Sequence, residues 1–163
     1  MPYTNFKTID DVREKLGVKI RSAESLFSDT QEIAPSDLLN RTLKETIPLA
    51  LSINTEKARS ELIIAPVLLD VRRIFDRKIS LFSGTDFNVD DSLDLNGYCD
   101  FLISASSDQI FIEVPVICIV EAKNENIVSG LGQCIAEMAA AAIYNEKENN
   151  PLSCIYGSVT TGD

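Results

Sequence analysis

The chain has 163 residues, of which 45% are hydrophobic and 25% are charged, a balance typical of one globular domain with a substantial core. Its formal net charge of −10 opposes contact with nucleic-acid phosphates unless a local basic patch or a bound metal offsets it. The sequence has no histidine, which excludes Ser-His-Asp and Cys-His catalysis and the H-E-x-x-H zinc site, and it has no G-x-x-x-x-G-K-[ST] phosphate loop.

The first 54 residues predict a small helical extension ahead of the main domain. Thr8 can cap a short amphipathic helix that ends at Gly17 and carries aspartates in its positive first turn. Ser36 can cap a second helix, which Pro48 is expected to kink or interrupt. Because this extension shows no catalytic pattern, we expect it to lie outside the catalytic core, which we place at residues 55–163 of a single domain.

A longer helix is expected from Glu56 to about Asp76, opened by Asn54 or Thr55. Pro66 should kink this helix, because proline lacks a backbone donor and crowds the carbonyl four residues back. The apolar residues of this helix recur at helical spacing and are expected to be buried. They are Ala58, Leu62, Ala65, Leu69 and Phe75.

Basic residues cluster on or just after the same helix, at Arg59, Arg72, Arg73, Arg77 and Lys78. Such a cluster suits either a solvated helix face or a track for nucleic-acid phosphates. The charge pattern favours the solvated face.

The first strand is predicted from Lys78 to Phe82, and Ser83-Gly84 should end it. The loop that follows, Thr85 to Asp94, holds four aspartates. It lacks the spacing and the closing glutamate of a calcium-binding EF-hand loop. We therefore interpret it as a connector.

Two further strands form the centre of the expected sheet. Tyr98 to Ser104 is expected to form the first of them, with Asp100 near its start. The run Pro115 to Val120 is short and wholly apolar, which is typical of a strand buried on both faces, and this second strand is expected to reach Ala122. The polar link Ala105 to Asp108 favours pairing of the two strands as an antiparallel hairpin. The start of the first strand would then lie beside the end of the second.

This hairpin brings charged side chains together. Glu121 and Lys123 project on one side of their strand, because side chains alternate with period two, and Asp100 on the neighbouring strand should meet Glu121. Two carboxylates with an ammonium between them suit Mg²⁺ or Mn²⁺, since hard cations take oxygen ligands and lysine can stabilise an attacking hydroxide or a phosphate oxygen. The alternative is an ordinary surface ion pair of Glu121 and Lys123, worth about 0 to 1 kcal/mol.

A helix from about Ile127 to Lys147 and a last strand from Leu152 to Thr160 complete the pattern. The helix joins two strands as a β-α-β crossover, so the last strand should run parallel to the central one. Gly130 and Gly132 offer a smooth surface for packing on the sheet. They are not a dinucleotide fingerprint, because Ile135 replaces the third glycine and the tight turn straight out of a strand is missing.

Several of these features, taken in order, resemble the restriction-endonuclease-like superfamily, PD-(D/E)XK. They are Gly97-x-x-Asp100, a hairpin, Glu121-Ala122-Lys123 at a strand end, and a helix carrying Gln133. The resemblance covers roughly Glu56 to Asp163 and leaves open a continuation of the chain beyond that point. It implies an α/β fold with a mixed sheet flanked by helices, and hydrolysis of nucleic-acid phosphodiesters with a divalent metal.

The resemblance also implies roles for two helical residues. Glu61 matches a glutamate that the family places on its first core helix, near the metal carboxylates, and Gln133 matches a polar residue beside the site. Each could instead be a solvated helix residue, as could Glu137, which lies one turn beyond Gln133.

The predicted function is therefore that of a metal-dependent nuclease. Asp100 and Glu121, with Glu61, would hold Mg²⁺ or Mn²⁺, Lys123 would orient or help deprotonate a water, and Gln133 would position that water or a phosphate oxygen. We expect the nucleic acid to be DNA, and the sequence leaves a homodimer open. The alternative is a catalytically inactive nuclease-like fold that acts as a binding or regulatory module, which the acidity of the chain favours.

Composition also bears on location and on the cysteines. No apolar run approaches the roughly 20 residues that cross a membrane, and the N-terminus lacks the basic and apolar regions of a signal peptide, so we expect a cytoplasmic protein without membrane contact. The four cysteines show no C-x-x-C spacing and lie in apolar segments. They are expected to be reduced core thiols rather than zinc ligands or disulfide partners.

Overall fold

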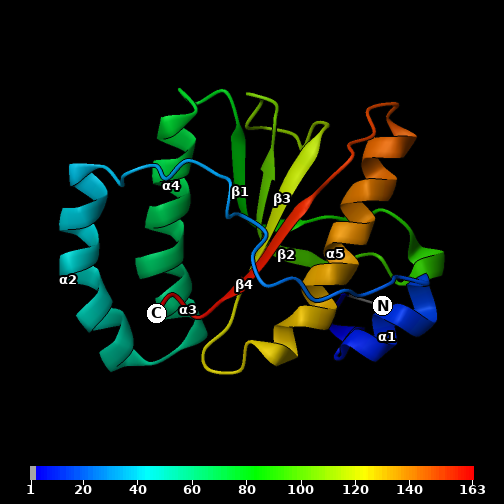
Figure 1. Cartoon of the computed structure of the whole chain (residues 1–163), viewed down its shortest axis with the longest axis horizontal. Helices are drawn as coiled ribbons and strands as arrows, with labels where there is room; N and C mark the ends of the chain where they lie inside the picture. Colours follow the sequence, from blue (N-terminus) through cyan, green and yellow to red (C-terminus); the bar gives the residue numbers. More distant parts are fainter. Residues whose placement is uncertain (1–2) are drawn as a thin grey trace.

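A mixed four-stranded sheet organises the described part of the chain, residues 3–163, in this computed structural model (Figure 1). The strands are β1 Ser80–Asp86, β2 Tyr98–Ser104, β3 Val116–Ala122 and β4 Tyr156–Thr160, in the order β1-β2-β3-β4. The first three pair antiparallel, and β4 pairs parallel with β3. The α/β class, the central hairpin and the parallel last strand are therefore confirmed.

Helices cover both faces of this sheet (Figure 1). They are α1 Ile9–Leu16, α2 Asp37–Ile53, α3 Glu56–Arg59, α4 Ala65–Ile74 and α5 Val128–Lys147, with a π-helical turn, Ser60–Ile64, between α3 and α4. One core, under α5, contains Leu102 and Ile119, and a second core, under α4, contains Phe101 and Val120. Neighbouring strand residues thus alternate between two cores, as in a strand buried on both faces. No helix within residues 3–163 combines the length and apolar character that a membrane span needs.

Capping residues set the helix boundaries that the sequence predicts. The Thr8 hydroxyl accepts from the Asp11 N–H and the Asp11 carboxylate accepts from the Thr8 N–H, so the two residues form a capping box at the start of α1. The helix ends at Gly17, whose φ of +66° lies in the left-handed region that glycine tolerates. Ser36 caps α2. This helix runs on through Pro48, so the expected interruption does not occur.

The π-helical turn lies where Pro66 interrupts the hydrogen bonds of the longer helix. Thr55 caps this helix as predicted. Pro66 has no N–H to donate to the carbonyl four residues back, which is that of Leu62. That carbonyl instead accepts a hydrogen bond from the Thr46 hydroxyl of α2, at 2.6 Å. The acceptor that proline frees is thereby used to dock α2 on this helix.

The same turn changes which side of the helix faces the sheet. A π turn adds one residue to a helical turn, so the burial pattern beyond it moves on by one position. Ile64 and Leu68 are buried, whereas Leu69 and Phe75 are exposed. The prediction that Leu69 and Phe75 are buried was wrong, because it assumed an unbroken α-helical phase.

Three strand boundaries also differ from the prediction. β1 begins at Ser80 and continues through Gly84 instead of ending there, because its pairing with β2 extends across the glycine. The link between β2 and β3 is longer than expected and spans 105–115. β4 begins at Tyr156 rather than Leu152. In each case, pairing with a neighbouring strand decides where the strand begins and ends.

The N-terminal segment is part of the main core, so the expectation that it lies outside was wrong. Tyr3, Phe6 and Val12 are buried in the core that lies under α5. The Tyr3 hydroxyl donates to the Phe87 carbonyl at 2.5 Å. Gly132 of α5 permits this close packing, since a Cβ there would lie 2.5 Å from the Phe6 carbonyl oxygen.

Gly132→Ala should therefore destabilise the protein. Alanine is favoured over glycine within a helix by about 1 kcal/mol, so the substitution would stabilise α5 if space were available. The added Cβ would instead lie 2.5 Å from the Phe6 oxygen and 2.7 Å from the Thr8 oxygen, and both are backbone atoms. We expect a net loss of about 1 to 3 kcal/mol in urea denaturation. Gly157→Ala is the control, because the atoms nearest to its Cβ belong to the Met138 and Cys134 side chains, which can move aside as backbone atoms cannot. A stabilised Gly132→Ala protein would contradict the packing argument.

The cysteines agree with the prediction in all but one position. All four are free thiols. Cys99 and Cys134 are buried and Cys118 is half-buried. Cys154 is exposed, so its predicted place in the core was wrong.

Candidate functional site

β2 and β3 place the central predicted site residues at one end of the sheet. The backbone pairing of these strands runs as far as Phe101 opposite Val120. One residue further, Asp100 accepts a hydrogen bond from the Ala122 N–H through its Oδ2, at 2.8 Å. This carboxylate takes the place of a backbone acceptor and lies beside Glu121, as the hairpin predicts.

Glu121 and Lys123 form a buried ion pair. Glu121 Oε1 accepts from Lys123 Nζ at 2.6 Å, and the side chains are 1% and 18% exposed. The second carboxylate oxygen, Oε2, is buried and has no hydrogen-bond partner among residues 3–163. The aliphatic part of Lys123 packs on Gly130, where a Cβ would lie 3.0 Å from Lys123 Cε. The pair is therefore not the exposed surface pair that the sequence left as an alternative.

Burial and neighbouring charges shift both members of this pair. Burial and the Asp100 carboxylate raise the pKa of Glu121, the hydrogen bond from Lys123 opposes the rise, and the resulting pKa is about 7. Burial lowers the pKa of Lys123, but the hydrogen bond to Glu121 and the nearby carboxylates outweigh it, so the net pKa is raised. Lys123 is consequently a fixed cation at neutral pH, whereas Glu121 can exchange its proton there.

Glu137 of α5 is a second buried carboxyl group close to this pair. Its side chain is 0% exposed, and its Oε1 accepts from Gln133 Nε2 at 3.0 Å. Burial and the charge of Glu121 together raise its pKa to about 8, against the opposing hydrogen bond from Gln133. Its Oε2 is buried without a hydrogen-bond partner in the described chain. Glu137 is thus not the solvated residue that the sequence allowed, and its four-residue spacing from Gln133 is the signal that places both on one helix face.

Glu61 lies apart from the buried pair. Its side chain is exposed and forms an ion pair with Lys57 at 3.4 Å, one turn away on the same helical stretch. It does share a pocket of about 250 Å³ with Asp100, next to the end of β3. The pocket is lined by Glu56, Lys57, Ser60, Glu61, Ser83, Gly84, Asp100 and Ala122. Glu61 therefore lies in the wall of an open pocket rather than in the interior.

Comparison with known proteins identifies no relative. No family model matches the chain, and no match to it was found among curated proteins or among solved structures.

The donor set for a metal is incomplete in this arrangement. Within residues 3–163, no group of three or more Asp, Glu, Cys or His side chains is arranged to hold a metal ion. Asp100, Glu121 and Glu61, the three predicted ligands, do not form such a group. Asp100 and Glu121 do lie on adjacent strands, and Asp100 already uses one oxygen for the Ala122 N–H.

The predicted cluster of basic residues separates into two parts. Arg59 is buried, and it lies near the end of β3. Arg72 and Arg73 lie in the last turn of α4, and Arg77 and Lys78 lie between α4 and the start of β1, where Ser80 pairs with Ser104. This is the end of the sheet opposite to Asp100, so these four residues do not line the pocket beside Asp100.

Proposed function

We propose that this chain is a metal-dependent nuclease of the PD-(D/E)XK type, with Asp100 and Glu121 as ligands of Mg²⁺ or Mn²⁺. The observation that carries the proposal is the buried Glu121 Oε2, which lacks a hydrogen-bond partner among residues 3–163. A buried carboxylate oxygen without a partner is costly, and a divalent cation is a partner that such oxygens bind well. The neighbouring Asp100 offers a second oxygen ligand of the same kind.

The residues around this pair fit hydrolysis of a phosphodiester. A bound cation would activate a water and offset charge on the phosphate. Lys123 holds a proton at Nζ and can donate a hydrogen bond to a phosphate oxygen on which charge develops. Gln133 donates its amide to Glu137, which leaves its amide oxygen to accept from a water. Glu61, in the pocket wall, would contribute a further carboxylate ligand from the solvent side. DNA is the substrate that we propose.

The incomplete donor set favours a second candidate function. A nuclease-like fold without a full metal site could bind a partner without catalysing a reaction. The absence of a three-residue metal group within residues 3–163 and the net charge of −10 both favour such a binding or regulatory module.

Metal-induced stabilisation and cleavage, measured on the same samples, test the first proposal. Mn²⁺ should raise the melting temperature of the wild type, because a ligand at 100 times its Kd stabilises the folded state by about 2.7 kcal/mol. Asp100→Asn should lose most of this increment, since asparagine keeps an acceptor for the Ala122 N–H but removes the charge. Glu146→Gln removes an exposed carboxylate of α5 and serves as the control.

Cleavage is then assayed on single- and double-stranded DNA and RNA with Mn²⁺. Wild type and Glu146→Gln should cleave DNA, and Asp100→Asn should not. An equal rise in melting temperature for Asp100→Asn and wild type would show that the metal binds at another site. A wild type that binds Mn²⁺ but cleaves none of the substrates would favour the binding module.

A further inference from the structure

Arg59, the last residue of α3, is a buried cation outside the ion pair described above. Its side chain is 8% exposed, which is rare for arginine unless partners satisfy the guanidinium. It lies at the end of the sheet where β3 finishes. The sequence alone places it with the solvated basic residues of its helix, so its burial needs another explanation.

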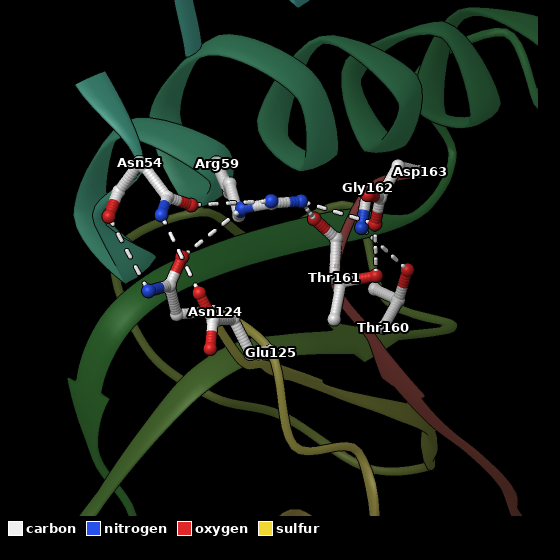
Figure 2. Close-up of polar contacts among 8 residues, drawn as sticks. All are labelled: Asn54, Arg59, Asn124, Glu125, Thr160, Thr161, Gly162 and Asp163. Carbon is white, nitrogen blue, oxygen red and sulfur yellow. Dashed lines mark hydrogen bonds and ion pairs between the residues drawn. The ribbon is translucent and has the colours of Figure 1, made fainter. Parts of the chain in front are cut away.

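The guanidinium of Arg59 binds three chain segments that are distant in sequence (Figure 2). Nε donates to Asn124 Oδ1 at 3.1 Å and Nη2 donates to Asn54 Oδ1 at 3.3 Å. Nη1 donates to the Thr161 carbonyl at 2.9 Å and lies 3.0 Å from the Asp163 carboxylate. Because the donors of arginine lie in one rigid plane, a single side chain fixes these partners relative to one another.

One of these partners lies next to Lys123 in the chain, and another lies next to its backbone acceptor. Asn124 follows Lys123 directly in the chain, and Thr161 follows Thr160, whose carbonyl accepts from the Lys123 N–H at 2.9 Å. Arg59 therefore holds the residue after Lys123 and also the residue after its backbone acceptor. No residue from 125 to 129 is buried, so polar contacts, those of Arg59 and Asn124 among them, hold the start of this loop.

A second set of contacts closes the network shown in Figure 2. Asn124 Nδ2 donates to the Asn54 carbonyl at 3.3 Å, and Asn54 Nδ2 donates to Glu125 Oε1 at 3.4 Å. Asn54 ends α2 in the left-handed conformation, with a φ of +53°. The end of α2 is thus joined to the turn after β3 through Arg59 and its asparagine partners.

We propose that Arg59 is a positioning residue, which fixes the residue after Lys123 and the residue after its backbone acceptor, Thr160, so that the Lys123 ammonium stays directed at Glu121. A lysine in its place would keep the charge but could not reach Asn54, Asn124 and Thr161 together. The part of this inference that concerns turnover rests on the proposed nuclease function. The part that concerns the backbone of Lys123 does not.

Hydrogen exchange and kinetics of Arg59→Lys test the two parts separately. Exchange of the Lys123 amide should rise at least about tenfold relative to that of the Ile119 amide, which lies in the middle of β3 and reports global opening. With DNA and Mn²⁺, kcat should fall by about tenfold or more, because small misplacements of a reacting group are costly, while KM and the Mn²⁺-induced rise in melting temperature stay unchanged.

Arg72→Lys is the matched control. Arg72 lies on α4, and its Nε also donates to a backbone carbonyl, that of Ile79, at 3.2 Å, but at the far end of the sheet. It should leave the Lys123-to-Ile119 exchange ratio within about twofold of wild type. Asn124→Ala removes one partner of Arg59 and should reproduce the change in exchange, so the test stands even if Arg59→Lys fails to fold.

The outcomes are distinguishable. If Arg59→Lys and Arg72→Lys change the exchange ratio equally, or if Arg59→Lys and Asn124→Ala both leave it unchanged, the positioning role is overturned. If the exchange ratio rises in Arg59→Lys but not in Arg72→Lys, the positioning role is supported. If that rise occurs while wild type cleaves no substrate, Arg59 still positions Lys123 and the nuclease proposal is the one that fails.

Discussion

Lys123→Met should abolish most hydrolysis while leaving metal binding intact. Protonated lysine has no lone pair for a metal, and its neighbours keep its pKa raised, so it is not a ligand. Methionine keeps an unbranched apolar stem that can pack on Gly130. In the proposed mechanism the ammonium would stabilise charge that develops as water attacks the phosphorus, and the loss of one such contact typically costs about a hundredfold or more in rate.

The measurement is a comparison of cleavage rates and of Mn²⁺-induced melting shifts for wild type, Lys123→Met and Glu121→Gln. It is best made at pH 8, above the pKa of about 7 for Glu121, so that this carboxylate is ionised. Glu121→Gln should lose both cleavage and the metal-induced shift, whereas Lys123→Met should lose cleavage alone. Lys147→Met, at the exposed end of α5, is the control. Equal trace activity in all four proteins would identify contamination and remove support for catalysis.

The centre of the fold was predictable from the sequence because its signals are local. β2 was predicted at its observed boundaries and β3 within one residue. The clearest local signal is the wholly apolar run Pro115 to Val120, which forms most of β3. The antiparallel pairing of β2 and β3 then places Asp100 beside Glu121 without further information. The caps at Thr8, Ser36 and Thr55 were equally local, since each side chain accepts from an N–H three residues on.

The surroundings of the site were less predictable because they depend on contacts between distant segments. Arg59 resembles a solvated helix residue in the sequence, yet its partners Asn124 and Thr161 lie 65 and 102 residues away. Gly132 was expected to pack on the sheet, but it meets the backbone of Phe6, whereas Gly130 does pack on β4 and Lys123. No periodicity within one helix distinguishes these cases.

Glu137→Gln should make the protein more resistant to alkaline pH. The folded-state pKa of Glu137, about 8, lies above the ordinary value of 4.5, because burial and the charges of Glu121 and Asp100 oppose ionisation while Gln133 and Lys123 favour it. The folded protein therefore holds this proton more tightly than the unfolded chain does. Its stabilising contribution is complete below about pH 4.5 and is lost as the pH rises toward 8.

Stability of wild type and Glu137→Gln is measured by urea denaturation at pH 5 and at pH 8. Glutamine resembles the protonated acid and still offers an oxygen to Gln133, so the two proteins should be similar at pH 5. At pH 8 the variant should be more stable by on the order of 1 to 4 kcal/mol, since a tenfold difference in proton affinity between the folded and unfolded states corresponds to about 1.4 kcal/mol. Glu146→Gln, which removes an exposed carboxylate, should match wild type at both values.

The range from pH 5 to pH 8 separates the effect of Glu137 on stability from the effect of the acids whose pKa values are lowered. Asp70 and Asp90 are stabilised by hydrogen bonds from Ser36 and Ser92, so their contribution is lost only as the pH falls below about 4. Between pH 5 and pH 8 the buried carboxyls Glu121 and Glu137 dominate the slope. If Glu137→Gln lowered stability equally at both pH values, Glu137 would have to be ionised and paired in the folded protein. In that case a bound cation or water would have to be the partner of Glu137 Oε2, which has no hydrogen-bond partner among residues 3–163.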